Sequence, residues 1–385
     1  MHFCINKNTL PLVVFLFSTL STLFIQILFL GTHWSPFAIW QIKFNPEIVY
    51  VCLLAMFFLT LGNFLYPYLF RINFLRGYEE IPSLDQFKLI KLIKLNSIFL
   101  VIFLIITQVS LGHSWIYNLW SGVVRGPDVE NAITDSIFGI HSILLILIFT
   151  SLILWTANFR LGLKNNRWLE LMLVIAFISS LSQGKIQILF YFAVTYLFQQ
   201  KESKLIKKIF ILALTILIIF FITRLLRNQG TNLVAGFDTF LLFVVGIYLG
   251  SPIVNAAYIL EHHALTNDLI IEFFKYMLPS RLYNETIFHS HFIDVTSPAG
   301  FIGHGLMLGS PFGLCLYSFL TGILIRHLAV KSSNNLTCYL FYPFLITSCL
   351  LVFLYDHFLN LVFFYIPMML CYLVAKHLKI KVNTN

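Results

Sequence analysis

The sequence contains little charge. Lys, Arg, Asp and Glu together make up only 11% of its 385 residues, whereas hydrophobic residues make up 59%. So little polar surface cannot cover a water-soluble globule of this size, and the mean hydropathy of +0.86 agrees with that conclusion. The composition therefore excludes a soluble domain and predicts a polytopic membrane protein whose surroundings are the lipid bilayer.

Several familiar motifs are missing as well. The six cysteines show no CxxC spacing and no pairing pattern, which argues against a disulfide framework and against a zinc site. The Gly-Lys pair at 184–185 does not belong to a GxxxxGK[ST] loop, so nucleotide binding is not expected there. No internal repeat and no low-complexity linker is evident. We therefore expect a single polytopic domain over residues 1–385.

What the sequence does contain is a series of apolar runs suited to crossing a hydrocarbon core of roughly 30 Å. These runs predict about ten transmembrane helices, at 11–30, 48–70, 95–111, 137–157, 168–182, 186–198, 209–223, 301–325, 339–355 and 358–376. The first run is interpreted as a retained span, because no small-x-small cleavage site follows it. With both termini in the cytoplasm, most of the 25 Lys and Arg fall on the cytoplasmic side. Topology thus explains the net charge of +9, and nucleic acid is not an expected partner.

Residues 236–260 are apolar enough for an eleventh span. An extra crossing would place the basic residues near the C-terminus outside, against the positive-inside rule. The Gly-Ser-Pro break at 250–252 indicates instead two short helices that dip into the membrane or lie against the bundle, where protein protects irregular backbone. We therefore expect residues 224–300 to form one large external loop that contains short helices.

Five basic residues on the expected outer face are candidates for binding an anionic substrate: Arg125, Lys185, Arg224, Arg227 and Arg281. Arg224 and Arg227 are three residues apart, so their guanidiniums share one helical face and repel each other unless an anion bridges them. Two forked donors side by side match the oxygens of a phosphate or pyrophosphate. The others have plainer alternatives: interfacial anchoring for the aromatic surroundings of Arg125, snorkelling for Lys185, and an ion pair with Glu285 for Arg281.

Three histidines near the point where the chain returns to the membrane are candidate general bases: His289, His291 and His304. An imidazole titrates near the working pH, which suits that role, and a carboxylate of the loop is an alternative base. His289, His291 and Asp294 also offer metal-ligand chemistry, but HxHxxD in a loop is a weak pattern, and neither a metal nor another cofactor is expected. His304 lies within Gly-His-Gly, whose glycines let a substrate or another backbone approach closely.

Two stretches, SLSQGKIQILF at 180–190 and SPAGFIGHGLMLGSPFGLCLYSF at 297–319, accompany the many spans and the large external loop. In these features the chain resembles the Wzy-type O-antigen polymerases, which polymerise oligosaccharide repeat units in bacterial envelopes, and the resemblance covers most of the chain. It implies an all-α integral membrane fold similar to the membrane-embedded C-type glycosyltransferases. It also implies a location in the bacterial inner membrane, with the active face and the loop 224–300 in the periplasm.

The resemblance further implies a glycosyltransferase of lipopolysaccharide biosynthesis that requires no metal. Such an enzyme transfers the growing glycan from undecaprenyl pyrophosphate to the non-reducing end of the next undecaprenyl-pyrophosphate-linked oligosaccharide. A chain-length regulator protein is a further implied partner. Arg125, Arg224, Arg227 and Arg281 occupy positions that suit an anionic lipid-linked substrate. A lipid-linked oligosaccharide flippase and an O-antigen ligase are the alternatives, because both handle the same lipid carrier.

Overall fold

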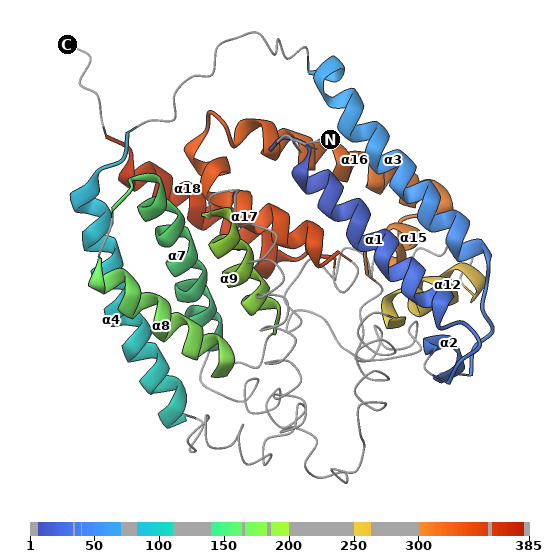
Figure 1. Ribbon diagram of the computed structural model, residues 1–385, viewed down its shortest axis with the longest axis horizontal. Helices are drawn as coiled ribbons and strands as arrows, with labels where there is room; N and C mark the ends of the chain where they lie inside the picture. Colours follow the sequence, from blue (N-terminus) through green and yellow to red (C-terminus); the bar gives the residue numbers. More distant parts are fainter. Residues whose placement is uncertain are drawn as a thin grey trace. The chain divides into compact units, whose positions relative to one another are not determined.

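The computed structural model (Figure 1) describes residues 7–33, 35–39, 41–70, 83–110, 140–163, 166–182, 186–199, 250–262, 300–352 and 356–380. The helices in these ranges are α1 (Leu10–Leu28), α2 (Pro36–Ile39), α3 (Glu47–Leu69), α4 (Gln86–Ser110), α7 (Ile140–Arg160), α8 (Arg167–Ser182), α9 (Ile186–Phe198), α12 (Ser251–His262), α15 (Gly300–Met307), α16 (Ser310–Lys331), α17 (Leu336–Leu350), the π-helix η5 (Leu361–Tyr365) and α18 (Ile366–Leu378). The described ranges contain no strand, only an isolated bridge between Leu84 and Lys379. The prediction of an all-α fold is confirmed for this part of the chain.

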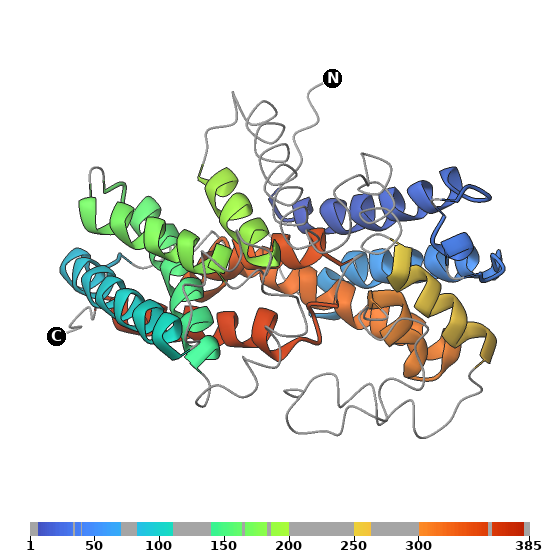
Figure 2. The same ribbon diagram turned by 90° about the horizontal axis from the view of Figure 1, so that it is seen from below.

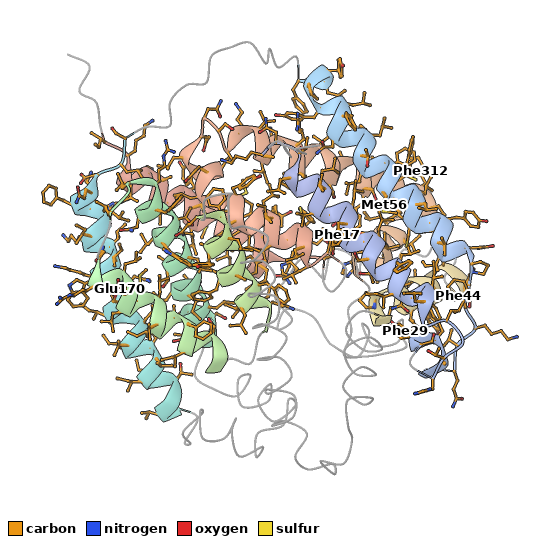
Figure 3. The ribbon with its side chains drawn as sticks, in the orientation of Figure 1. Phe17, Phe29, Phe44, Met56, Glu170 and Phe312 are labelled. Carbon is orange, nitrogen blue, oxygen red and sulfur yellow. The ribbon has the colours of Figure 1, made fainter. Side chains whose placement is uncertain are left out.

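Six helices are long and apolar enough to cross a membrane: Leu10–Leu28, Glu47–Leu69, Gln86–Thr107, Ser142–Arg160, Pro311–Lys331 and Leu361–Leu378. Two shorter apolar helices, Gln187–Phe198 and Leu336–Leu350, accompany them. Large apolar side chains are exposed on these helices, among them Phe17 of α1 and Phe312 of α16, which are labelled in Figure 3. Exposed phenylalanines on apolar helices of this length match lipid and not water. The protein therefore has the features of an α-helical membrane protein.

The predicted helix bounds differ from the structure most clearly at 301–325. The sequence predicts one continuous span there, but the chain forms two helices, α15 and α16, with a break at Gly309. Gly309 has φ +134°, a backbone conformation that residues with a side chain rarely adopt. Pro311 lies in the first turn of the new helix. The predicted runs 168–182 and 186–198 match α8 and α9 closely. The run 209–223 lies outside the described residues.

Contacts group the chain into two compact units. Unit 1 comprises Met1–Glu80, Phe237–Cys338 and Leu345–Tyr365, and unit 2 comprises Ile81–Gly236, Tyr339–Phe344 and Ile366–Asn385. Each unit draws on segments that are far apart in the sequence, so the units do not follow one another as successive domains would. The prediction of one domain over residues 1–385 stays a prediction.

Unit 1 is built around the close pairing of α3 with α16, which Figure 1 shows side by side. A Cβ atom added at Gly62 would collide with the carbonyl oxygen of Phe319, and one added at Gly322 would collide with the carbonyl oxygen of Leu59. The Asn63 amide donates to the Gly322 carbonyl at 3.4 Å. Small residues let membrane helices approach this closely and gain dispersion contacts that lipid cannot replace. This glycine seam fixes α16, and α16 contacts α15.

Unit 2 packs α4, α7, α8 and α18 together, and α4 lies beside α7 in both Figure 1 and Figure 2. The side-chain amide of Asn96 joins those two helices, donating to Ser151 Oγ at 2.8 Å and to the Leu147 carbonyl at 3.2 Å. The rings of Phe149 and Phe344 add an edge-to-face contact with centroids 5.7 Å apart. An amide bridge and aromatic packing therefore hold this unit together.

Candidate functional site

The structure describes one of the predicted site residues, His304. The other seven lie outside the described residues: Arg125, Lys185, Arg224, Arg227, Arg281, His289 and His291. Their roles stay predictions. The site can therefore be built from His304 and from the side chains that surround it.

His304 lies on α15, a helix whose eight residues are all buried. The helix begins at Gly300, with φ +63°, and ends before the break at Gly309. A Cβ atom added at Gly305 would collide with the side chain of Leu314. The space beside that flanking glycine is thus filled by Leu314 of α16.

A buried carboxylate faces the His304 ring. The Oδ2 atom of Asp356 lies 3.4 Å from His304 Nδ1, and both side chains are 0% exposed. The Tyr317 hydroxyl donates to the same Oδ2 atom at 2.6 Å, a short distance typical of a hydrogen bond to a carboxylate. Three elements supply this His304–Asp356–Tyr317 cluster: α15, α16 and the segment between α17 and η5. It brings an imidazole, a carboxylate and a phenol together in the interior of an apolar protein.

Sequence reasoning missed Asp356 and Tyr317. Asp356 lies in the stretch LVFLYDHFLNLVFF at 351–364, between the predicted spans 339–355 and 358–376, where it resembles an ordinary polar turn residue. The signal that could have found it is an acidic residue next to a histidine within an apolar stretch, because ionisable groups inside a membrane protein are costly and usually functional. Tyr317 gave no comparable signal, since tyrosine is common in this sequence.

The geometry of the cluster suits proton transfer. A carboxylate opposite Nδ1 favours the tautomer that carries its proton on that nitrogen, which leaves Nε2 with the lone pair that accepts a proton. The distance of 3.4 Å is longer than a tight hydrogen bond. The arrangement is that of a histidine base oriented by an acid.

The ring of Phe301 packs against the phenol of the cluster. It stacks on Tyr317 with centroids 4.8 Å apart and meets Phe15 of α1 edge-on at 5.0 Å. Phe301 also lines a cavity of about 30 Å³ together with Thr19, Thr22 and other residues of α1, α3, α12 and α15. That volume exceeds the 10 to 15 Å³ or so that one water molecule needs. Phe301 therefore contacts both the cluster and a small, mostly apolar cavity.

His357 follows Asp356 directly and behaves differently. It is 0% exposed, its ring lies 5.3 Å from that of Phe363, and burial lowers the pKa of its imidazole from 6.5 to about 3. Desolvation disfavours the charged form of a buried histidine, so His357 stays neutral at physiological pH. It does not serve as a proton acceptor near neutrality, which leaves His304 as the candidate base among the two.

No protein-family model matches the chain, and neither a curated protein nor a solved structure matches it. What the cluster does must therefore be inferred from its own chemistry and from the sequence around it.

Proposed function

We propose that this protein polymerises lipid-linked oligosaccharide repeat units, as the Wzy-type O-antigen polymerases do. The observation that carries the proposal is that His304, a candidate base from the sequence, faces the buried carboxylate of Asp356 in an α-helical membrane protein. Transfer of a glycan to a sugar hydroxyl needs a proton acceptor close to a lipid-linked donor. A histidine oriented by a carboxylate within a membrane domain meets that need.

The proposed reaction assigns a role to each candidate residue. The acceptor hydroxyl attacks the anomeric carbon of the growing glycan, its proton passes to His304 Nε2, and the bond to undecaprenyl pyrophosphate breaks with its electrons leaving on the phosphate. Arg224, Arg227 and Arg281 stabilise the negative charge that develops on the leaving group. Arg125 and Lys185 position the substrate. His289 and His291 remain alternative bases within the same proposal.

The proposal includes the finer topology: about ten spans, both termini in the cytoplasm, and residues 224–300 as a periplasmic loop in the bacterial inner membrane. The helix α12 lies inside that range and begins at Ser251, at the Gly-Ser-Pro break. A helix that begins at this break supports the proposed loop with short helices.

A deletion strain examined on a lipopolysaccharide gel tests the proposal. Core that carries a single repeat unit is expected, and a full ladder in the deletion strain would contradict polymerase activity. Complementation with the double variant Arg224→Ala and Arg227→Ala is expected to lower polymer by roughly 100-fold, the scale of losing a charge-stabilising donor. The matched control is Lys88→Ala with Lys91→Ala, which removes two cations at the same spacing from α4. Full polymer from the double arginine variant would overturn the pyrophosphate assignment.

A proton-coupled flippase for the same lipid is the second candidate. The His304–Asp356 pair favours it, because buried acid–histidine pairs in membrane proteins also serve as proton relays. The same gel distinguishes the two, since loss of a flippase leaves core without any repeat unit. Loss of an O-antigen ligase also leaves bare core, so that result would move the assignment away from the polymerase.

A further inference from the structure

We propose that Asp356 and His304 act as one proton-holding unit, in which Asp356 sets the tautomer of His304 and Tyr317 fixes the orientation of the carboxylate. The inference deepens the proposed function and rests on it for the identity of the substrate. It adds two positioning residues, Asp356 and Tyr317, to a site that the sequence assigns to histidines alone.

One carboxylate oxygen atom of Asp356 contacts both Tyr317 and His304. Tyr317 donates to Asp356 Oδ2 at 2.6 Å, and His304 Nδ1 lies 3.4 Å from that same atom. The phenol approaches from α16 and the imidazole from α15, so the carboxylate is held between two helices that meet at the Gly309 break. A carboxylate anchored in this way offers its lone pairs to Nδ1 and leaves Nε2 as the basic nitrogen.

A second feature of the unit is its charge. Within the described residues, the group that can pair with Asp356 is His304, which is charged only when it is protonated, and no described Lys or Arg pairs with Asp356. A lone charge in such an interior is costly, but an imidazolium beside a carboxylate sums to zero. When His304 accepts the acceptor hydroxyl's proton, the O–H electrons form the new glycosidic bond, and the lone carboxylate charge becomes a neutral imidazolium–carboxylate pair. The other titratable neighbours are His357, next in sequence, and Tyr365 of η5, which interacts electrostatically with Asp356.

Packing holds the unit in place. Phe301 stacks on the Tyr317 ring at 4.8 Å with an interplanar angle of 29°, which limits how far the phenol can turn away from the carboxylate. Tyr317 itself is only 8% exposed. The hydroxyl is therefore preset toward Asp356, and removing it should loosen the carboxylate without emptying the core.

Activity variants test whether the pair is a unit. In membranes of the deletion strain that contain the cell's own lipid-linked repeat units, Asp356→Asn, His304→Gln and the double variant should each lower polymer per folded protein by a similar factor of roughly 100 or more. Asp356→Glu should restore part of the activity, because it returns the carboxylate, and Tyr317→Phe should cost less than tenfold. The control Asp85→Asn removes a partly exposed carboxylate whose Oδ2 atom lies 3.3 Å from Lys88 Nζ. Wild-type activity in Asp356→Asn, or losses that multiply in the double variant, would overturn the inference.

A spectroscopic measurement separates this inference from the proposed function. In purified protein with nitrogen-15-labelled histidine, the His304 signals are assigned by their loss in His304→Gln. Asp356→Asn should change the His304 tautomer, whereas Asp85→Asn should not. An unchanged tautomer in Asp356→Asn would overturn the inference whatever the gel shows. If the deletion strain still polymerises, the proposed function fails, and the tautomer measurement still decides whether the pair is coupled.

Discussion

The two compact units treat their buried polar groups differently. Among the described residues, the buried histidines and the buried carboxylate, His304, His357 and Asp356, all belong to unit 1. In unit 2 the buried polar groups include Asn96 and Ser151, which bond to each other at 2.8 Å. One unit thus encloses groups that can change charge, and the other encloses neutral amides and hydroxyls.

This difference separates polar groups that stabilise helix packing from polar groups that can transfer a proton. A neutral amide bridge between membrane helices contributes modestly, about 0.6 kcal/mol on average, and needs nothing beyond its partner. A buried carboxylate costs several kcal/mol unless a cation or a proton accompanies it, and proteins retain such groups where they are used. Among the described residues, the contrast therefore places the candidate base in unit 1 and predicts that disturbing the Asn96–Ser151 bridge of unit 2 affects stability alone.

The largest expected effect comes from the glycine seam of unit 1. Gly322→Ala would place a methyl group against the Leu59 carbonyl, which belongs to backbone and cannot swing aside. Overpacking of this kind costs about 3 kcal/mol. We expect a large fall in the thermal unfolding temperature in detergent and in the yield of folded protein.

The matched control adds the same methyl group in unit 2. Gly162 follows α7 with φ +64°, and nothing lies within 4 Å of an added Cβ atom. Gly162→Ala should therefore lower the free energy of unfolding only through the unfavourable backbone conformation, by about 1 kcal/mol. Equal losses in the two variants would show that the close approach of α3 and α16 is not what holds unit 1 together.

The second effect appears only in acid. The pKa of His357 falls from 6.5 to about 3 on burial, so the unfolded chain binds a proton more readily than the folded protein. The free energy of unfolding is therefore unaffected by His357 above pH 6.5. As the pH falls from 6.5 toward 3, it decreases by about 1.4 kcal/mol per pH unit. Between pH 6.5 and 5, the free energy of unfolding of the wild type should fall by about 2 kcal/mol more than that of His357→Gln.

Thermal unfolding in detergent across that range measures the difference. The control is His377→Gln, which changes an exposed histidine on α18 of unit 2 and should leave the pH dependence as it is. A His357→Gln variant with the wild-type pH slope would mean that His357 is not the group that sensitises unit 1 to acid.

The smallest effect tests whether the Asn96 bridge of unit 2 contributes to stability alone. Asn96→Leu removes the bonds to Ser151 and to the Leu147 carbonyl and should cost about 1 kcal/mol of stability. Polymer per folded protein should stay at the wild-type level, measured as ladder intensity against the amount of extracted protein. A loss comparable with that of Asp356→Asn would break the comparison between the units.

Much of the fold could be predicted from composition and from the lengths of the apolar runs. These dictate helices wherever the backbone must satisfy its own hydrogen bonds in lipid, which is why α8 and α9 match their predicted runs. The break at Gly309 was missed because the runs on both sides are apolar, although Gly-Ser-Pro at 309–311 repeats the break signal that was used at 250–252. Hydropathy measures the preference for lipid and is insensitive to a single residue with positive φ.

The site was predictable only in part. His304 stands out because glycines flank it, and sequence alone can register that local feature. Its partner Asp356 lies in a different segment, and the contact between them arises from the packing of α15, α16 and the turn before η5. One sequence gives no measure of that distance. The hydrogen bond from Tyr317 was hidden for the same reason.

The three residues of the His304–Asp356–Tyr317 cluster are synthesised at different times. His304 and Tyr317 belong to neighbouring helices, whereas Asp356 follows Tyr317 by 39 residues, after all of α17. Because synthesis runs from the N-terminus, the imidazole and the phenol reach the bilayer before their carboxylate exists. The cluster is therefore completed only when the segment after α17 has been made. A chain that stalls at the end of α17 would contain the histidine and the phenol but not the carboxylate that faces them.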